Sequence, residues 1–411
     1  MKIMVIGSGG REHAIIKALR GDIYALPGNG GIAEDATCVD IAATDIENIV
    51  KFAQSEGIDY AVVAPDDPLV LGCVDALEKV GIPCFGPNRR AAIIEGSKAF
   101  AKDMMKKYGI PTADYEIFDN AEDALAYVSD CKIPIVIKAD GLALGKGVII
   151  SETREDAQAA IRSIMEDKQF GDSGNKIVIE EYLEGPEVSV LTFTDGKTVV
   201  PMVSSMDHKR ALDGDRGLNT GGMGTVAPNP HYTSEIADRC MKEIFLPTIK
   251  AMNDLNRTFK GCLYFGLMIT NDGPKVIEYN CRFGDPETQV VLPLLKTDLL
   301  DIMQAVTEER LSEINVEFTD DCATCVIMAS AGYPVKYDKG FELTYPEDEL
   351  IYIAGAKLED DKLVTNGGRV LGCVGIDKTL KGSIDVAYAI ADKVHFDNAY
   401  MRSDIGKRAL L

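Results

Sequence analysis

The chain has 411 residues, of which 46% are hydrophobic and 26% charged, a composition typical of a globular protein with about two to four domains. Its net charge of −22 argues against non-specific binding to nucleic acid or to an anionic membrane, and an anionic ligand therefore needs a locally basic site. No apolar run is long enough to span a membrane, and the N-terminus enters a strand-like segment directly, so we expect neither a signal peptide nor a membrane span.

Ten cysteines are scattered through the sequence, most of them in apolar surroundings. Such cysteines are typical of buried thiols in a reducing cytosol, and we predict a cytoplasmic protein. Cys322 and Cys325 have the spacing of a redox or zinc pair, but neither a second pair nor a nearby histidine accompanies them. We predict that both are structural thiols.

The first third of the sequence alternates strand-like and helix-like segments. The strand-like segments are 2–6, 60–64 and 82–85, and the helix-like segments are 11–20, 45–56 and 69–80. This alternation predicts a parallel α/β sheet with helices on both faces. Ligands of such sheets bind at the carboxyl ends of the strands, where loops 7–11, 27–31 and 65–68 lie. We expect these loops to form one small-molecule pocket, although an ordinary turn explains each of them singly.

Two basic segments follow. Ser97 is a suitable N-cap for a helix that ends at Tyr108, and Lys98 lies in its first turn, where the helix dipole disfavours a cation unless an anionic ligand is nearby. An apolar run, 133–137, predicts a strand that leads to Lys138 and then to a loop with three glycines and a second lysine, 141–147. This pattern suits a lid over a polyphosphate, because glycines allow close backbone approach and lysines supply charge. A solvated lysine and a plain β-hairpin are the simpler alternatives.

The middle of the chain supplies polar groups at strand ends. Residues 153–168 predict an amphipathic helix, and a strand over 176–182 carries Glu180, with Glu187 in the next strand. Apolar walls and a strand end suit an adenine, and Glu187 could accept a hydrogen bond from a ribose hydroxyl. An exposed strand face is the alternative for both glutamates.

Two further polar segments, 207–210 and 219–225, flank a charged loop. The second contains three glycines in four residues, which again allows close backbone approach. Together they could grip a small zwitterionic or phosphorylated substrate. A mobile surface loop is the alternative.

A predicted hairpin, with strands 264–270 and 274–278, ends in three different polar residues. Strand alternation places Glu278, Asn280 and Arg282 on one face. A carboxylate and an amide oxygen suit Mg²⁺ held partly by substrate phosphates. The arginine could hold a carboxylate or a transferring phosphoryl group.

At this point the sequence resembles a known family, the phosphoribosylamine–glycine ligases of the ATP-grasp superfamily. The matching segments run nearly from end to end of the chain: 7–14, 27–29, 95–98, 137–147, 207–210, 219–224, 278–287 and 365–371. The resemblance implies an ATP-dependent carboxylate–amine ligase of purine biosynthesis. Such an enzyme joins glycine to 5-phosphoribosylamine through a glycyl phosphate, and needs Mg²⁺ or Mn²⁺ with ATP as co-substrate.

The resemblance also implies roles for single residues. Those expected to bind ATP are Lys98, Lys138, Gly141, Leu142, Ala143, Leu144, Gly145, Lys146, Gly147, Glu180, Tyr182, Leu183 and Glu187. Glu278 and Asn280 are expected to hold the metal, and Arg282, Lys138 and Lys209 to act in catalysis. Those expected to bind glycine or phosphoribosylamine are Gly9, Gly10, Arg11, Asn29, Pro65, Asp66, Asp67, Asp207, His208, Lys209, Asn219, Thr220, Gly221 and Arg282.

The expected architecture has three domains. An N-terminal parallel α/β domain covers 1–102, an ATP-grasp domain covers 103–296 with a lid-bearing subdomain over 113–184, and an α+β domain covers 297–411. The last domain is expected to give structural support only. The expected partners are the three small-molecule substrates, with transient contact to neighbouring purine-pathway enzymes. Many ATP-grasp enzymes carry a second acidic metal ligand one strand earlier, whereas segment 266–269 has none.

Three alternative functions differ from this interpretation in the sequence features that they require. A nicotinamide-dependent dehydrogenase requires a full glycine fingerprint, which Glu12 interrupts. A non-enzymatic nucleotide-binding module has no use for the metal and arginine group. Other carboxylate–amine ligases of purine synthesis are the nearest rivals, and segments 208–210 and 219–224 favour the glycine-using enzyme by resemblance.

Overall fold

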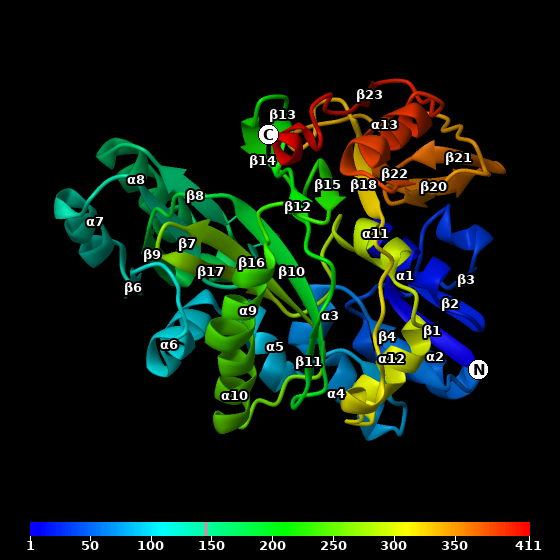
Figure 1. Ribbon diagram of the computed structural model, residues 1–411, viewed down its shortest axis with the longest axis horizontal. Helices are drawn as coiled ribbons and strands as arrows, with labels where there is room; N and C mark the ends of the chain where they lie inside the picture. Colours follow the sequence, from blue (N-terminus) through cyan, green and yellow to red (C-terminus); the bar gives the residue numbers. More distant parts are fainter. Residues whose placement is uncertain (144–146) are drawn as a thin grey trace.

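The computed structural model describes residues 1–143 and 147–411 (Figure 1). Its first unit is a five-stranded sheet in the order β3-β2-β1-β4-β5, and every pairing in it is parallel. The elements of this unit are β1 (Lys2–Gly7), α1 (Gly10–Ala18), β2 (Asp22–Pro27), β3 (Thr37–Cys38), α2 (Ile46–Glu56), β4 (Tyr60–Val63), α3 (Asp66–Leu71), α4 (Cys73–Lys79), β5 (Cys84–Phe85) and α5 (Arg89–Gly96). The predicted parallel α/β unit is confirmed.

The helix predicted over 69–80 differs from the structure in two ways. The chain forms two helices there, because Gly72 has φ +92° and breaks the helical path between α3 and α4. The first helix also begins earlier, with Pro65 as its N-cap, so Asp66 and Asp67 form its first turn. The segment expected to be a loop is therefore a helix start, where carboxylates are favoured by the helix dipole.

Helix α6 (Lys98–Tyr108) leads to a second, smaller unit, at the left of Figure 1. Ser97 caps this helix as predicted, since its hydroxyl accepts a hydrogen bond from the Phe100 amide. The unit is an antiparallel sheet in the order β6-β9-β7-β8. Its elements are β6 (Tyr115–Phe118), α7 (Ala121–Asp130), β7 (Ile135–Ala139), β8 (Val148–Ser151), α8 (Arg154–Ile161), the π-helical turn η3 (Arg162–Glu166) and β9 (Ile177–Glu181). Its apolar core is formed by residues of 118–179 alone.

A third sheet, in the order β11-β10-β16-β17, is antiparallel throughout. Its elements and the helices beside it are β10 (Glu187–Thr194), β11 (Val199–Pro201), α9 (Ser234–Cys240), α10 (Leu246–Asp254), β16 (Gly261–Thr270) and β17 (Gly273–Asn280). The predicted hairpin is confirmed as β16 and β17. A register shift occurs between Gly266 and Leu267, with Gly266 opposite Glu278, and no acidic side chain lies on this part of β16.

The fourth sheet combines distant parts of the chain. Strands from the middle of the sequence and from its C-terminal part pair in the order β12-β15-β18-β22-β19, with β23 beside β18. Its elements and their neighbours are β12 (Met206–Asp207), β13 (Arg210–Leu212), β14 (Arg216–Asn219), β15 (Gly224–Ala227), α11 (Thr288–Val291), α12 (Leu299–Thr307), β18 (Cys322–Ser330), β19 (Ile351–Ile353), β20 (Ala356–Glu359), β21 (Lys362–Thr365), β22 (Arg369–Asp377), α13 (Leu380–Ala391) and β23 (Ala399–Tyr400). The predicted α+β character of this part is confirmed, and both polar segments of the middle region are attached to it.

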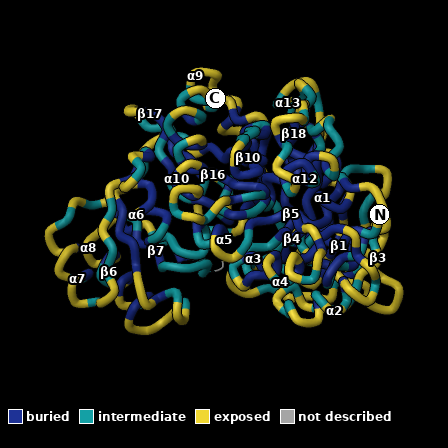
Figure 2. The backbone as a smooth tube through the Cα atoms, turned by 90° about the horizontal axis from the view of Figure 1, so that it is seen from below, coloured by how far each residue is buried: buried dark blue, intermediate teal, exposed yellow. Residues whose placement is uncertain are grey.

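The N-terminal sheet is buried on both faces. Residues of one face belong to the apolar cluster that includes α2, α4 and α5 and extends to α10, β16 and β17, and residues of the other face belong to the cluster that includes α1, α11, α12 and β18. Figure 2 shows this as a continuous buried interior around β1, β4, β10 and β16, with exposed backbone at α7 and α8. All ten cysteines are free, as predicted. Among the described residues, no helix has the length and apolarity needed to cross a membrane.

Candidate active site

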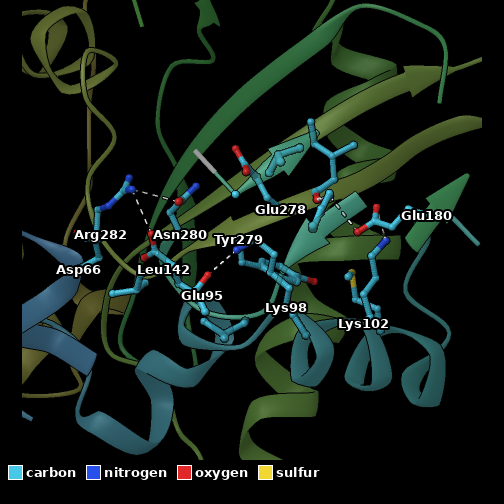
Figure 3. Close-up of a pocket in the computed structure, with 18 residues that line it drawn as sticks. Asp66, Glu95, Lys98, Lys102, Leu142, Glu180, Glu278, Tyr279, Asn280 and Arg282 are labelled. Carbon is cyan, nitrogen blue, oxygen red and sulfur yellow. Dashed lines mark hydrogen bonds and ion pairs between the residues drawn. The ribbon is translucent and has the colours of Figure 1, made fainter. Parts of the chain in front are cut away.

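A pocket lies where the small sheet faces α5, α6 and the end of β17 (Figure 3). Charged residues from five separate stretches of the chain line it. The polar and loop residues at its wall are Asp66, Glu95, Lys98, Lys102, Lys138, Gly141, Leu142, Gly147, Glu180, Glu278, Asn280 and Arg282. The apolar part of the wall includes Met105, Val148 and Ile277. A pocket of mixed apolar and cationic lining suits a nucleotide, which carries a flat base and a polyanion.

Two lysines predicted from sequence meet in this pocket. Lys138, on β7, is buried, and its ammonium donates to the Ile277 carbonyl at 2.8 Å and lies 2.9 Å from Glu180 Oε1. Lys98, in the first turn of α6, donates to the Gly141 carbonyl at 2.6 Å. Burial, together with the charge of Lys138, lowers the pKa of Lys98 below its ordinary value. Cations that repel one another in a buried site are stabilised by an anionic ligand, and a polyphosphate is one.

The predicted metal pair lies on β17. Glu278 and Asn280 both line the pocket, and an Arg282 guanidinium nitrogen lies 3.1 Å from Asn280 Oδ1. Burial alone would raise the pKa of Glu278, but Lys209 and the other cations around it hold that pKa below its ordinary value. The carboxylate is therefore ionised, as a metal ligand must be.

The donor set fits a hard divalent cation in part. Two oxygen ligands converge, whereas the described residues contain no group of three His, Cys, Asp or Glu side chains that could hold a metal alone. A cation at Glu278 and Asn280 would need further oxygens from a bound phosphate, which is how Mg²⁺ is commonly held.

Arg282 is held by a residue that the sequence analysis did not select. Its guanidinium pairs with Glu95 Oε1 at 3.1 Å, and Glu95 Oε2 accepts the Cys281 amide at 2.6 Å. Burial raises the pKa of Glu95, and the charge of Arg282 opposes that rise. Glu95 lies in a helix whose sequence pattern is not unusual. The only sequence signal for it is the segment 95–98, which resembles the family and also contains Lys98.

A second polar region adjoins the pocket where the N-terminal, central and C-terminal parts of the chain meet. Arg369, on β22, lies 3.1 Å from Asp285 and donates to the Gly221 carbonyl at 2.7 Å. Arg11 donates to the Phe283 carbonyl at 3.2 Å. A Cβ atom on Gly10 would lie 2.8 Å from Gln289 Nε2, so a larger residue at position 10 would displace the end of the Gln289 side chain. The predicted segments 9–11, 219–221 and 282–287 are thus neighbours in space.

Comparison with known proteins agrees with this geometry across the chain. The N, ATP-grasp (A) and C domains of phosphoribosylglycinamide synthetase match residues 1–95, 96–288 and 323–408. The chain belongs to the phosphoribosylglycinamide synthetase family.

Relatives in this family cover the whole chain. The phosphoribosylamine–glycine ligase of Clostridium acetobutylicum is 46% identical over 414 residues, 99% of this chain and 100% of that protein. The Escherichia coli O157:H7 ligase is 45% identical over 424 residues, 100% of this chain and 99% of its own length. The crystal structure of the Thermotoga maritima ligase has a TM-score of 0.88 at 35% identity, covering 98% of this chain and 100% of that one.

A more distant likeness concerns the fold alone. The biotin carboxylase domain of Hydrogenobacter thermophilus 2-oxoglutarate carboxylase has a TM-score of 0.76 at 15% identity, covering 97% of this chain and 91% of that one. The three-part architecture is therefore shared beyond the synthetase family.

The structure describes ten of the thirteen residues predicted to bind ATP. Six of the ten line the pocket, namely Lys98, Lys138, Gly141, Leu142, Gly147 and Glu180, whereas Glu187 is not among its lining residues. Leu144, Gly145 and Lys146 lie outside the described residues. Tyr182 is 40% exposed, and Leu183 packs with Ala113 and Met268 instead of lining the described pocket. The flanking Gly141, Leu142 and Gly147 do line it, whereas Ala143 packs against the apolar core of the small sheet.

Two residues predicted to bind substrate already form hydrogen bonds with other parts of the protein. Asn29 donates to the Ser8 and Ile353 carbonyls at 2.9 Å, and its Oδ1 accepts two backbone amides, so it joins loops of the first and last units. His208 is fully buried, with Nδ1 3.2 Å from the Gly224 carbonyl and the Gly406 amide 3.2 Å from Nε2. Neither side chain has a free polar atom for a substrate in this arrangement, because tertiary hydrogen bonds that the sequence does not reveal use them.

The neighbours of His208 lie closer to the pocket. Lys209 is 3.2 Å from Glu187 and 3.5 Å from Glu278, which connects the predicted ribose ligand with the predicted metal ligand. Asp207 has a buried Oδ1 atom without a hydrogen-bond partner among the described residues, and burial, followed by the charge of Glu287, raises its pKa well above the ordinary value. A buried carboxylate oxygen without a partner is available to a ligand donor.

The other predicted substrate residues lie around the same junction. Thr220 donates to the Lys209 carbonyl at 2.8 Å, and Asn219 pairs with Arg210 in the β13–β14 hairpin. Asp66 lines the nucleotide pocket, whereas Pro65 caps α3. Burial raises the pKa of Asp67, and the charge of Asp66 adds to that rise.

Proposed function

We propose that this chain joins glycine to 5-phosphoribosylamine in an ATP-dependent reaction, giving glycinamide ribonucleotide, ADP and phosphate. The observation that carries the proposal is the placement of Lys98 and Lys138 at one pocket with Glu278, Asn280 and Arg282. Phosphoryl transfer needs this combination of phosphate-binding cations, a metal site and an arginine near the transferred group. Whole-length similarity to proteins named phosphoribosylamine–glycine ligase supports the choice of substrates.

The first step activates the glycine carboxylate. A carboxylate oxygen attacks the γ-phosphorus of ATP, the bond from that phosphorus to the bridging oxygen breaks, and ADP leaves. Lys98 and Lys138 hold the phosphates, and Arg282 stabilises the negative charge on the transferring group. Arg282 is suited to this role because Glu95 fixes its orientation from behind.

The second step forms the amide. The amine of phosphoribosylamine attacks the glycyl carbonyl carbon, the C–N bond forms, the bond to the phosphate oxygen breaks, and the amine loses a proton. Glycyl phosphate hydrolyses in water, so the predicted lid, 141–147, would have to exclude water while the intermediate exists, and its described residues Gly141, Leu142 and Gly147 line the pocket. Lys209, which contacts both Glu187 and Glu278, would lie beside the reacting groups, and these two ion pairs support that role.

Glu278 and Asn280 would hold Mg²⁺ or Mn²⁺ together with phosphate oxygens. The cation supplies charge neutralisation on the phosphates when it is bound. Both metals are proposed, because Mg²⁺ and Mn²⁺ both prefer oxygen ligands.

The second polar region would hold the other substrates. Segments 9–11, 207–209 and 219–221, with Asp66 and Asp67, offer backbone amides and carboxylates for glycine and for the ribose phosphate. We also propose the domain limits 1–102, 103–296 and 297–411, with the lid-bearing subdomain over 113–184. The first limit falls inside α6, so that helix would join the first two domains. A cytoplasmic location and transient contact with neighbouring purine-pathway enzymes complete the proposal.

ADP release tests the proposed reaction. Purified protein is supplied with ATP and Mg²⁺, and ADP is measured with glycine alone, with freshly made phosphoribosylamine alone, and with both. Turnover that requires both substrates is expected. If the protein binds ATP but its ADP release depends on neither glycine nor phosphoribosylamine, the proposed ligation is contradicted.

A further inference from the structure

A buried lysine outside the predicted site lies at one end of the nucleotide pocket. Lys102 is on α6, one helical turn after Lys98, and its side chain is only 3% exposed. Figure 3 shows Lys102 and Glu180 together on one side of the pocket, with Arg282 and Asn280 on the other side. Because the phosphoryl group is transferred near Arg282, Lys102 and Glu180 lie at the opposite end of a bound nucleotide.

Lys102 is surrounded by protein acceptors among the described residues. Its ammonium lies 2.9 Å from Glu180 Oε2, donates to Thr112 Oγ1 at 2.8 Å, and donates to the Ala113 carbonyl at 3.4 Å. Two of these contacts are hydrogen bonds and the third is an ion pair, and an ammonium group has only three donors. Any effect of Lys102 on the nucleotide must therefore pass through the groups that it holds.

Glu180 connects Lys102 to a residue that does face the ligand. Its other carboxylate oxygen, Oε1, lies 2.9 Å from the ammonium of Lys138, although not in hydrogen-bond geometry. Lys138 also donates to the Ile277 carbonyl, next to the proposed metal ligand Glu278. One buried carboxylate on β9 is thus shared by lysines on two different elements, α6 and β7.

The charge balance explains why both lysines matter. Burial lowers the pKa of Lys102 to about 8, against the opposing effect of Glu180, so Lys102 is cationic at neutral pH. The three side chains then carry one net positive charge, which is available to a polyanion. Without Lys102, Glu180 would be neutralised by Lys138 alone, because a buried charge without a partner is costly. Lys138 would be held by Glu180 instead of the phosphates.

We propose that Lys102 is a positioning residue for the nucleotide, which fixes the Glu180 carboxylate and thereby keeps the Lys138 ammonium directed at the ligand. The inference rests on the proposed ATP site and adds a residue that touches no ligand itself. It predicts an effect on ATP affinity that is transmitted only through Glu180.

The test compares three variants with the wild-type protein. In Lys102→Met the KM and Kd for ATP rise by about tenfold or more, the range set by losing a hydrogen bond to a charged group. In the same variant the KM for glycine and kcat change by less than about twofold. Lys102→Arg, which keeps the charge, restores ATP affinity. Lys106→Met is the matched control, because Lys106 is exposed on the same helix and lies over the same Tyr115 ring.

A double-mutant cycle separates positioning from a merely structural role. Once Glu180→Gln is present, Lys102→Met has no further effect on ATP affinity, since the two residues act as one unit. The inference is overturned if the effects of the two substitutions on the Kd for ATP multiply in the double variant. It is also overturned if folded Lys102→Met binds ATP with unchanged affinity. If Lys102→Met does not fold, normal ATP affinity in Glu180→Gln overturns it instead.

ATP affinity is measured by calorimetry in the absence of glycine and phosphoribosylamine. Failure of the ligase reaction would then contradict the proposed function while leaving this test in place. A protein that binds ATP normally after either substitution contradicts the positioning role alone.

Discussion

The Arg369 guanidinium lies 3.1 Å from the Asp285 carboxylate, and this ion pair joins the C-terminal sheet to the segment that follows β17, the strand of the proposed metal ligands. The same guanidinium donates to the carbonyls of Gly221 and Asp285. The C-terminal part of the chain therefore contacts the region proposed to bind the substrates, in addition to the structural support expected of it. Arg369 contacts Gly221, in a segment proposed to bind substrate, and Asp285, in the segment after the proposed metal ligands.

Replacement of Arg369 tests this connection. Arg369→Ala should lower kcat/KM for glycine and phosphoribosylamine by about tenfold to a hundredfold, because the hydrogen bonds of this charged group to the Gly221, Gly222 and Asp285 carbonyls are lost. The Kd for ATP should stay near the wild-type value, since Arg369 does not line the nucleotide pocket. Lys362→Ala, an exposed change in the same part of the chain, is the control. An equal loss of ATP affinity would show a general disturbance.

Lys138 is expected to act on binding. Lys138→Met removes the ammonium between Glu180 and the Ile277 carbonyl, and it leaves one buried cation fewer for the phosphates. We expect the Kd for ATP to rise by about tenfold or more, from the loss of charge-assisted contacts. Lys132→Met, on the same sheet unit but exposed, should bind ATP normally. Calorimetry with ATP and Mg²⁺ measures both, and equal affinities would contradict the assignment.

Arg282 is expected to act on turnover. Arg282→Ala should reduce kcat by about a hundredfold or more while the Kd for ATP changes little, because its contact with the transferring group forms in the transition state. The substitution also leaves Glu95 buried without its ion-pair partner, which costs about 3 kcal/mol of stability. Glu95→Gln/Arg282→Ala removes that penalty and should recover stability without recovering kcat. Unchanged turnover in either variant would count against the role of Arg282.

Much of the fold and site could be predicted from local patterns. The Ser97 cap, the hairpin of β16 and β17 and the strand that carries Lys138 each depend on a few neighbouring residues, and the structure contains all of them. The two-helix break at Gly72 was missed, because a glycine inside a helical pattern is ambiguous until its φ is known.

Contacts between distant segments could not be predicted in this way. Lys102 reads as a solvated lysine of an amphipathic helix, and only the arrival of β9 with Glu180 buries it. Arg369 meets Asp285 across 84 positions of sequence. The polar cluster around His208 predicts a substrate ligand, but Nε2 of the ring accepts a hydrogen bond from the amide of Gly406, near the C-terminus. Side-chain partners of this kind depend on tertiary packing.

The buried His208 predicts a pH-dependent stability. Burial, assisted by the charges of Arg408 and Arg402, lowers the pKa of His208 to about 4, below its usual value near 6.5. As the pH falls from 6.5 to about 4, the unfolded chain takes up a proton that the native protein does not. The native state then loses stability, by at most about 3 kcal/mol.

The measurement is the free energy of unfolding in urea from pH 7.5 to 4.5. In His208→Gln, whose amide oxygen can still accept the Gly406 amide, the fall over this range should be smaller than in the wild-type protein. The same slope in both proteins would contradict the assignment, and a steeper slope in the variant would reverse its sign.

Oxygen transfer tests the central claim most directly. Glycine labelled with ¹⁸O in its carboxylate is supplied with ATP, Mg²⁺ and phosphoribosylamine, and the phosphate released is analysed by mass spectrometry. Because a carboxylate oxygen attacks the γ-phosphorus and leaves with it when the amide forms, each phosphate should carry one ¹⁸O atom, in equal amount to ADP and glycinamide ribonucleotide. The second ¹⁸O atom should remain in the amide carbonyl of glycinamide ribonucleotide. Phosphate without label would contradict a glycyl phosphate intermediate at this site.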